Sequence, residues 1–214
     1  MKTEKIFNTI IALSILGVVI SSFYFYQVLP DMVITHWNWQ GQADGWSSKN
    51  FQVIFFPALM LAMYGLFKFL PRLDPHRKNY QDFKVAYLMI QFLLMLFFTL
   101  LYLITSLVNL GYNISITWAM MTMIGIMFGV FGFYMPHLKR NWFVGIRTPW
   151  TLSSDIVWAR THQYGAKVFW LAGLIFIIMP YLPAAWIVYA FILAMFLILS
   201  SIVYSYLVYR SQKN

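Results

Sequence analysis

The sequence has no cysteine and very little charge. Only 10% of its 214 residues are Asp, Glu, Lys or Arg, whereas roughly a quarter of residues are charged in an average soluble domain. The absence of cysteine excludes disulfide bridges and thiolate metal sites. Acidic residues are the scarcest charges, with six against fifteen basic residues. Together with 61% hydrophobic residues, this composition indicates a protein whose main solvent is lipid.

The apolar residues form six long blocks that short polar segments separate. A helix that crosses a bilayer needs about 20 mainly apolar residues, and each block meets or approaches this length. The fifth block is the shortest and ends in Pro180, Tyr181, Leu182 and Pro183, which cannot continue a helix, so we expect a tight hairpin between the fifth and sixth helices. The predicted spans are Ile6–Val28, Phe51–Leu70, Val85–Val108, Trp118–Met135, Ala166–Tyr181 and Ala184–Tyr209.

The distribution of Lys and Arg predicts the orientation, because basic residues in short loops stay on the cytoplasmic side. With the amino terminus inside, the outer segments hold only Lys49. The cytoplasmic segments then hold Lys2, Lys5, Arg72, Arg77, Lys78, Lys84, Lys139, Arg140, Arg147, Arg160, Lys167, Arg210 and Lys213. We therefore expect an all-α integral membrane protein with six transmembrane helices, with both termini in the cytoplasm and with structured loops on both faces.

The predicted spans carry no Asp, Glu, Arg or His near their middle. Because ion and proton pathways use such residues, an ion-coupled transporter or pump is disfavoured. In the fourth span, Gly125, Gly129 and Gly132 give a stripe of small residues, which is typical of a face on which another helix packs closely.

The segment 29–50 is predicted to lie outside the cell. Its glycines, Asn38 and Asp44 favour turns, and its tryptophans suit the bilayer boundary. His36 could donate a hydrogen bond to a peptide or a lipid headgroup, whereas only Asp31 and Asp44 lie near enough in sequence to join it at a metal ion, so we expect no metal site. The candidate contact residues in this outer loop are His36, Trp37, Asn38, Gly41, Asp44 and Gly45.

The segment 136–165 is predicted to be cytoplasmic and to contain a structured turn. Pro149 disfavours helix at Thr148, and Gly145 allows backbone conformations that other residues avoid. A short helix is expected after Ser153 or Ser154, with Asp155 in its first turn, lying along the inner membrane surface until the chain enters the fifth span at about Gly165.

Side chains of this segment suggest more than membrane anchoring. In the expected short helix, Trp158 and His162 are four residues apart and share one face. The guanidinium of Arg147 could pin the loop to backbone carbonyls, bind a lipid phosphate or meet an acidic group of a partner. The simpler alternative makes Arg147 a topology charge and Trp150 an interfacial anchor. For Arg140 we expect a topology charge only.

The string from Gly145 to Leu152, followed by Trp158 and by Thr161 with His162, resembles the signature of the bacterial SdpI-type immunity proteins. The outer segment is similar to the small N-terminal domain that often precedes that signature. The resemblance implies an N-terminal two-helix domain of residues 1–70, with its outer loop at 29–50, and a four-helix region of residues 71–214, with its cytoplasmic loop at 136–165. The loop residues it singles out are Asn141, Gly145, Arg147, Thr148, Pro149, Trp150, Thr151, Leu152, Trp158 and His162.

What the resemblance implies is protection of a bacterium against a secreted antimicrobial peptide toxin met on the outer face. It also implies a signalling role, in which the protein captures a small DNA-binding repressor at the cytoplasmic face. The chain itself is then expected to bind no nucleic acid and no cofactor. A role in general envelope stress, a small-solute or lipid transporter, and a membrane enzyme are the alternatives. An enzyme would need converging groups, and the cytoplasmic residues His76, His137, His162 and Asp155 show no recognisable catalytic spacing.

Overall fold

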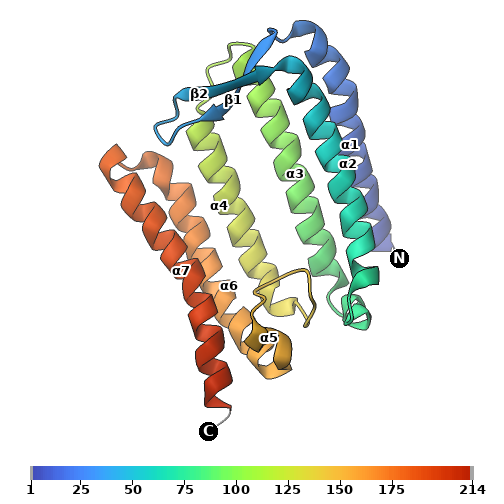
Figure 1. Cartoon of the computed structure of the whole chain (residues 1–214), viewed down its shortest axis with the longest axis vertical. Coiled ribbons are helices and arrows are strands. Elements are labelled where there is room, and N and C mark those ends of the chain that lie inside the picture. Colours follow the sequence, from blue (N-terminus) through green and yellow to red (C-terminus); the bar gives the residue numbers. More distant parts are fainter. Residues whose placement is uncertain (1, 213–214) are drawn as a thin grey trace. The chain divides into compact units, whose positions relative to one another are not determined.

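The computed structural model describes residues 2–212, and most of this part of the chain is helical (Figure 1). Within it, six helices are long and apolar enough to cross a membrane, which confirms the predicted all-α, six-span plan. Lys213, one of the residues used to predict the orientation, lies outside the described residues. The elements in chain order are α1 (Lys2–Val28), β1 (Met32–Trp37), β2 (Ala43–Ser48), α2 (Lys49–Leu73), the 3-10 helix η1 (Arg77–Gln81), α3 (Lys84–Asn109), α4 (Ile116–Tyr134), η2 (Met135–His137), α5 (Pro149–Ser153), α6 (Asp155–Ile178), η3 (Met179–Tyr181) and α7 (Ala184–Ser211).

The chain divides into two compact units, and three helices contribute to both. Unit 1 consists of Met1–Phe67 and Gln91–Met120, and unit 2 consists of Lys68–Ile90 and Met121–Asn214. The predicted outer segment therefore belongs to unit 1, and the predicted signature segment belongs to unit 2.

In unit 1 the predicted outer loop is an antiparallel β-hairpin of β1 and β2, which the sequence had suggested only as a set of turns. Ile34 lies opposite Trp46, and two register irregularities follow towards the turn. The Asn38 side-chain oxygen accepts hydrogen bonds from the backbone N–H groups of Gln40 and Gln42, both at 3.0 Å. Gly41 has a φ of 79°, which glycine adopts without steric cost. Asn38 and Gly41 thus form a turn, as the sequence predicted, whereas Asp44, also expected in a turn, lies in β2.

The hairpin is held to α3 by a side-chain amide. The Oδ1 atom of Asn109 accepts the N–H of Ile34 at 2.7 Å, and the Nδ2 atom of Asn109 donates to the Ile34 carbonyl at 3.1 Å. This pairing imitates the two hydrogen bonds that a neighbouring strand would make. Val33, beside it, is fully buried. One edge of the hairpin is therefore closed by the end of a membrane helix.

In unit 2, glycines bring α4 against α6 as the sequence predicted. A Cβ atom added at Gly125 would lie 2.6 Å from the Gly173 carbonyl oxygen, and one at Gly132 would lie 2.9 Å from the Ala166 carbonyl oxygen. Only glycine permits such close backbone approach at these positions. Gly125 and Gly132 of the small-residue stripe are therefore positions of close contact with α6, whereas a Cβ atom at Gly129 would meet nothing within 4 Å.

The expectation of a separate surface helix ending near Gly165 is wrong, because α6 runs without a break from Asp155 to Ile178. Gly165 is buried, and a Cβ atom there would lie within 2.6 Å of side-chain atoms of Ile146 and Met135. The glycine thus serves close packing inside one helix and does not mark a helix start. The predicted tight hairpin that follows is confirmed, since η3 turns the chain directly into α7, which packs along α6.

Candidate functional site

The candidate site is the signature loop, defined as residues 138–154 between η2 and α6, together with the α6 side chains that close over it. Asn141 organises its first turn and is fully buried. Its Oδ1 atom accepts the backbone N–H groups of Phe143 and Val144, at 2.9 and 2.7 Å, and its Nδ2 atom donates to the carbonyls of Lys139 and Val144. All the hydrogen-bonding capacity of this amide is therefore spent inside the loop.

Gly145 and His162 form the centre of the site. Gly145 has a φ of 111°, and a Cβ atom at this position would collide with the Nε2 atom of His162. His162 accepts the Ile146 N–H at Nε2 over 3.1 Å, and its Nδ1 lies 2.8 Å from the Trp158 carbonyl. Because a carbonyl only accepts, Nδ1 carries the proton and the imidazole is neutral. The buried His162 side chain therefore connects α6 to the loop, because it hydrogen-bonds the Trp158 carbonyl of α6 and the Ile146 N–H of the loop.

A capping box starts the short helix α5. Thr148 is extended, as Pro149 predicts, and its hydroxyl accepts the Thr151 N–H at 3.1 Å, while the Thr151 hydroxyl accepts the Thr148 N–H at 2.9 Å. The Thr151 hydroxyl also donates to the Ile146 carbonyl at 2.9 Å. The Thr148 hydroxyl lies 3.1 Å from that of Ser205 on α7. The Thr148 contact with Ser205 connects the loop to α7, as the His162 contact with Ile146 connects it to α6.

Aromatic rings complete the closure of the loop. Trp158 and His162 stack with their ring centroids 4.1 Å apart, which confirms that they share a face of the helix. The Trp158 Nε1 atom donates to the Leu138 carbonyl at 2.8 Å. Trp150 lies against Tyr206 of α7, with centroids 5.0 Å apart. These two tryptophans are packed in the protein, whereas Trp142 is 51% exposed.

A carboxylate that sequence reasoning missed supports the loop from the segment after α2. Asp74 is 2% exposed, and its oxygens accept hydrogen bonds from the Tyr80 hydroxyl at 2.8 Å, the His76 N–H at 2.7 Å and the Trp142 N–H at 2.8 Å. Burial, and then the hydrogen bond to Asp74, raise the pKa of the Tyr80 phenol well above its ordinary value. Tyr80 therefore stays a donor to Asp74 at every physiological pH.

Arg147 is exposed, and it reaches back over the loop. Its Nη1 atom donates to the Trp142 carbonyl at 2.6 Å. This contact agrees with the first of the roles predicted for Arg147, pinning the loop to a backbone carbonyl. A guanidinium has several N–H donors in a rigid fork, so the rest of its surface remains available for an anionic group.

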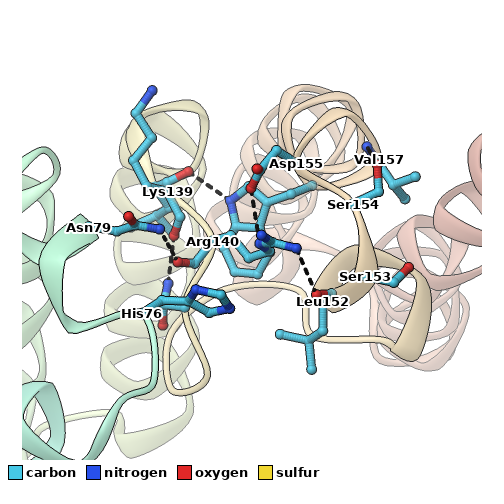
Figure 2. A network of polar contacts seen from close by, with 12 residues as sticks. His76, Asn79, Lys139, Arg140, Leu152, Ser153, Ser154, Asp155 and Val157 are labelled. Carbon is cyan, nitrogen blue, oxygen red and sulfur yellow. Dashed lines mark hydrogen bonds and ion pairs between the residues drawn. The ribbon is translucent and has the colours of Figure 1, made fainter.

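Arg140 is more than the topology charge that the sequence suggested. Figure 2 shows its side chain between Asp155 and the Leu152 carbonyl, with an Nε to Oδ1 distance of 3.0 Å in the ion pair and an Nη1 to carbonyl distance of 3.1 Å. Its own carbonyl accepts a hydrogen bond from the Asn79 side chain at 2.8 Å. Ser154 beside it caps α6, as predicted. Arg140 thus links the loop to α5, α6 and the segment after α2. The sequence did not indicate these contacts, because the residues involved are not adjacent along the chain.

The outer candidate residues lie in the hairpin of unit 1 and not with the signature loop. His36 and Asp44 face each other across the strands, with Nδ1 and Oδ1 2.5 Å apart, and both are solvent-exposed. A Cβ atom at Gly45 would lie 2.8 Å from the His36 Cβ atom, so glycine permits this cross-strand contact. Among residues 2–212, no three His, Asp or Glu side chains gather as metal ligands would.

These features define a multi-pass helical membrane protein with a short β-hairpin and a closed, hydrogen-bonded loop. Residues 137–209 match the SdpI/YfhL protein family, and residues 12–61 match a domain of unknown function, DUF1648. The chain is 28% identical over 199 residues to the protein named Immunity protein SdpI of Bacillus subtilis (strain 168). The aligned region covers 93% of this chain and 91% of that relative. The resemblance to the SdpI family is thereby confirmed. No solved structure matches the chain significantly.

Proposed function

We propose that this protein is an immunity protein of the bacterial cell membrane, which protects the cell against a secreted antimicrobial peptide. The observation that carries the proposal is the similarity to Immunity protein SdpI, because it extends over 93% of the chain and includes both the hairpin and the signature loop. In this proposal residues 1–70 form the N-terminal domain and residues 71–214 form the SdpI-like region.

Both termini lie in the cytoplasm in this proposal. The charge distribution supports it, since Lys49 is the only basic residue of the segments that would then be outside. The hairpin follows the first span and therefore faces the secreted peptide, whereas the signature loop follows the fourth span and faces the cytoplasm.

The protein acts by binding and not by catalysis. His162 uses both ring nitrogens within the fold, so it has no free lone pair with which to accept a proton. A general base needs a free lone pair within reach of its substrate. The loop instead presents Arg147 and the exposed ring of Trp142 beside each other, which suits a protein partner. A small DNA-binding repressor with an acidic surface would be such a partner.

The test of immunity is to express the protein in a bacterium that is sensitive to the toxin of an SdpI-type immunity system. We expect survival to rise while intact peptide remains in the medium, measured by mass spectrometry. Equal killing with and without the protein would refute the proposed immunity. Cleavage or modification of the peptide by purified protein in lipid would replace it with an enzyme.

The test of the signalling role is a reporter gene controlled by the repressor of an SdpI-type immunity system, expressed together with this protein. We expect peptide to induce the reporter only in cells with the wild-type protein. The Arg147→Ala variant should abolish induction, while the variant Arg160→Ala, at an exposed arginine of α6, should not. Induction that persists in Arg147→Ala would remove the loop as the contact with the repressor.

A further inference from the structure

The two outer edges of the β-hairpin differ in their hydrogen bonding. The N–H and the carbonyl of Ile34 are both engaged by Asn109, so they point away from β2. In an antiparallel pair, a residue whose backbone groups point outward faces a partner whose groups also point outward. Ile34 lies opposite Trp46. The N–H and carbonyl of Trp46 therefore point outward from β2.

Within the described residues of unit 1, no side chain closes the β2 edge as Asn109 closes the β1 edge. Trp46 is 56% exposed, so this residue of the β2 edge lies at the surface. Exposed strand edges pair readily with a further strand, and proteins usually block them. Here the block is present at one edge of the hairpin and absent from the other.

The charges around the hairpin select the partner. Segment 29–50 contains Asp31, Asp44 and Lys49, which give a formal charge of −1 with two acidic groups and one basic group. Asp31, whose side chain is 92% exposed, is paired with Lys49 at 3.0 Å, and Asp44, whose side chain is 43% exposed, lies against His36. The uncompensated negative charge of the segment is therefore that of the accessible Asp44 carboxylate. Such a surface favours a cationic partner over an anionic one.

We propose that the β2 edge binds a cationic peptide as an added strand, with the N–H and carbonyl of Trp46 as its central hydrogen-bonding pair. Backbone hydrogen bonds supply affinity in this mode of recognition, and side-chain contacts supply selectivity. The exposed ring of Trp46 provides an apolar contact for alternate side chains of the peptide. This inference rests on the proposed immunity, because it gives the outer face a way to hold the secreted peptide.

The test uses a synthetic peptide of alternating lysine and valine as the probe, with the full chain in phosphatidylcholine nanodiscs. Trp46→Ala and Trp46→Pro both remove the indole, but only proline removes the outward N–H, and no β1–β2 hydrogen bond uses that N–H. We expect Trp46→Pro to bind the peptide about tenfold more weakly than Trp46→Ala, which corresponds to the loss of one hydrogen bond. Equal binding by the two variants, or equal binding by empty nanodiscs, would overturn the proposal.

Changes in the peptide test the same contact without altering the protein. Only every second N–H of a strand faces its neighbour. N-methylation of either the odd or the even peptide residues should therefore abolish binding, while N-methylation of the other set should leave it unchanged. Tolerance of N-methylation in both sets would overturn strand addition.

If cells with the wild-type chain resist the toxin and those with Trp46→Pro resist it equally, this inference fails while immunity stands. If the wild-type chain gives no resistance, the nanodisc result still decides strand addition.

Discussion

Asp74 and Arg147 hold the backbone of Trp142 from its two sides. The Oδ2 atom of Asp74 accepts the Trp142 N–H at 2.8 Å, and the Nη1 atom of Arg147 donates to the Trp142 carbonyl at 2.6 Å. One residue of the signature loop is thus fixed between a buried carboxylate and an exposed guanidinium. The exposed ring of Trp142 is displayed by a backbone that cannot readily turn.

Replacing Asp74 with Asn should loosen the loop. The carboxylate accepts from three donors, whereas an amide has one acceptor oxygen, so at least one donor would face an NH2 group. We expect a loss of about 2 kcal/mol of stability, seen as earlier thermal unfolding in detergent and faster trypsin cleavage within residues 138–154. The matched control is Asp82→Asn, at an exposed position, which should change neither measurement. An Asp74→Asn loop as resistant to trypsin as the wild type would contradict this role.

Arg147→Lys and Arg147→Ala should both reduce protection against the peptide, with nearly unchanged amounts of protein in the membrane. Lysine keeps the charge, but it lacks the planar fork that can hold the Trp142 carbonyl and an anionic group together. Survival assays beside membrane immunoblots measure both effects. Full protection by Arg147→Lys would show that charge alone suffices, and loss of the protein from the membrane would show a folding role.

Arg140→Lys would be tolerated if Arg140 were only a topology charge, but the structure predicts that this variant is not neutral. Its guanidinium contacts both Asp155 and the Leu152 carbonyl. Arg160→Lys, at an exposed position of α6, replaces it as the control and should leave protection intact.

Gly145→Ala should disrupt the site through two separate effects. The backbone there has a φ of 111°, and the added Cβ would meet the His162 ring. The backbone strain alone should cost about 1 to 3 kcal/mol. The double variant Gly145→Ala with His162→Ala removes the collision but not the strain, so it should remain less stable than His162→Ala alone. Gly65→Ala, in an open position of α2, should be neutral or stabilising in the same thermal assay.

Two glycines of α4, one helical turn apart, should respond differently to alanine. A Cβ at Gly125 would lie 2.6 Å from the Gly173 carbonyl oxygen, whereas one at Gly129 would meet nothing within 4 Å. We expect Gly125→Ala to lower stability by about 1 to 3 kcal/mol through overpacking, while Gly129→Ala unfolds at the wild-type temperature. Equal unfolding temperatures for the two variants would contradict the close packing of α4 on α6.

The absence of cysteine permits a direct test of the proposed topology. In intact cells, a membrane-impermeant maleimide should label Ser48→Cys and should label Ser153→Cys only after lysis, since both positions are exposed in the fold. Reporters fused within residues 72–84 should be cytoplasmic, and those within residues 31–49 external. Labelling of Ser153→Cys before lysis would reverse the orientation.

Local chemistry made much of the signature loop predictable. Gly145, the extended Thr148 before Pro149, and the shared face of Trp158 and His162 all follow from the properties of neighbouring residues. The six spans follow equally directly from apolar length. Each of these predictions needs only information within a few residues of the position concerned.

The contacts missed from the sequence connect distant segments. Asp74 and Trp142 are 68 residues apart, and Ile34 and Asn109 are 75 apart. A single carboxylate or amide carries no signal of which remote N–H it will accept. The hairpin was missed as strands because glycine, serine and asparagine obscure the alternation of its short segments. The unbroken α6 was missed because Gly165 suggests a helix end until its close packing is seen.

The continuity of α6 also has a mechanical consequence. The same rigid helix carries Trp158 and His162 at the signature loop and Gly173 against α4. At about 1.5 Å of rise per residue, the stack and the glycine contact are separated by roughly 16 to 22 Å of uninterrupted hydrogen-bonded backbone. A partner that turned the loop end of α6 would therefore turn the glycine contact as well. That contact leaves no room for an added atom, so it would resist the rotation. The packing of α4 on α6 therefore also limits movement of the signature loop.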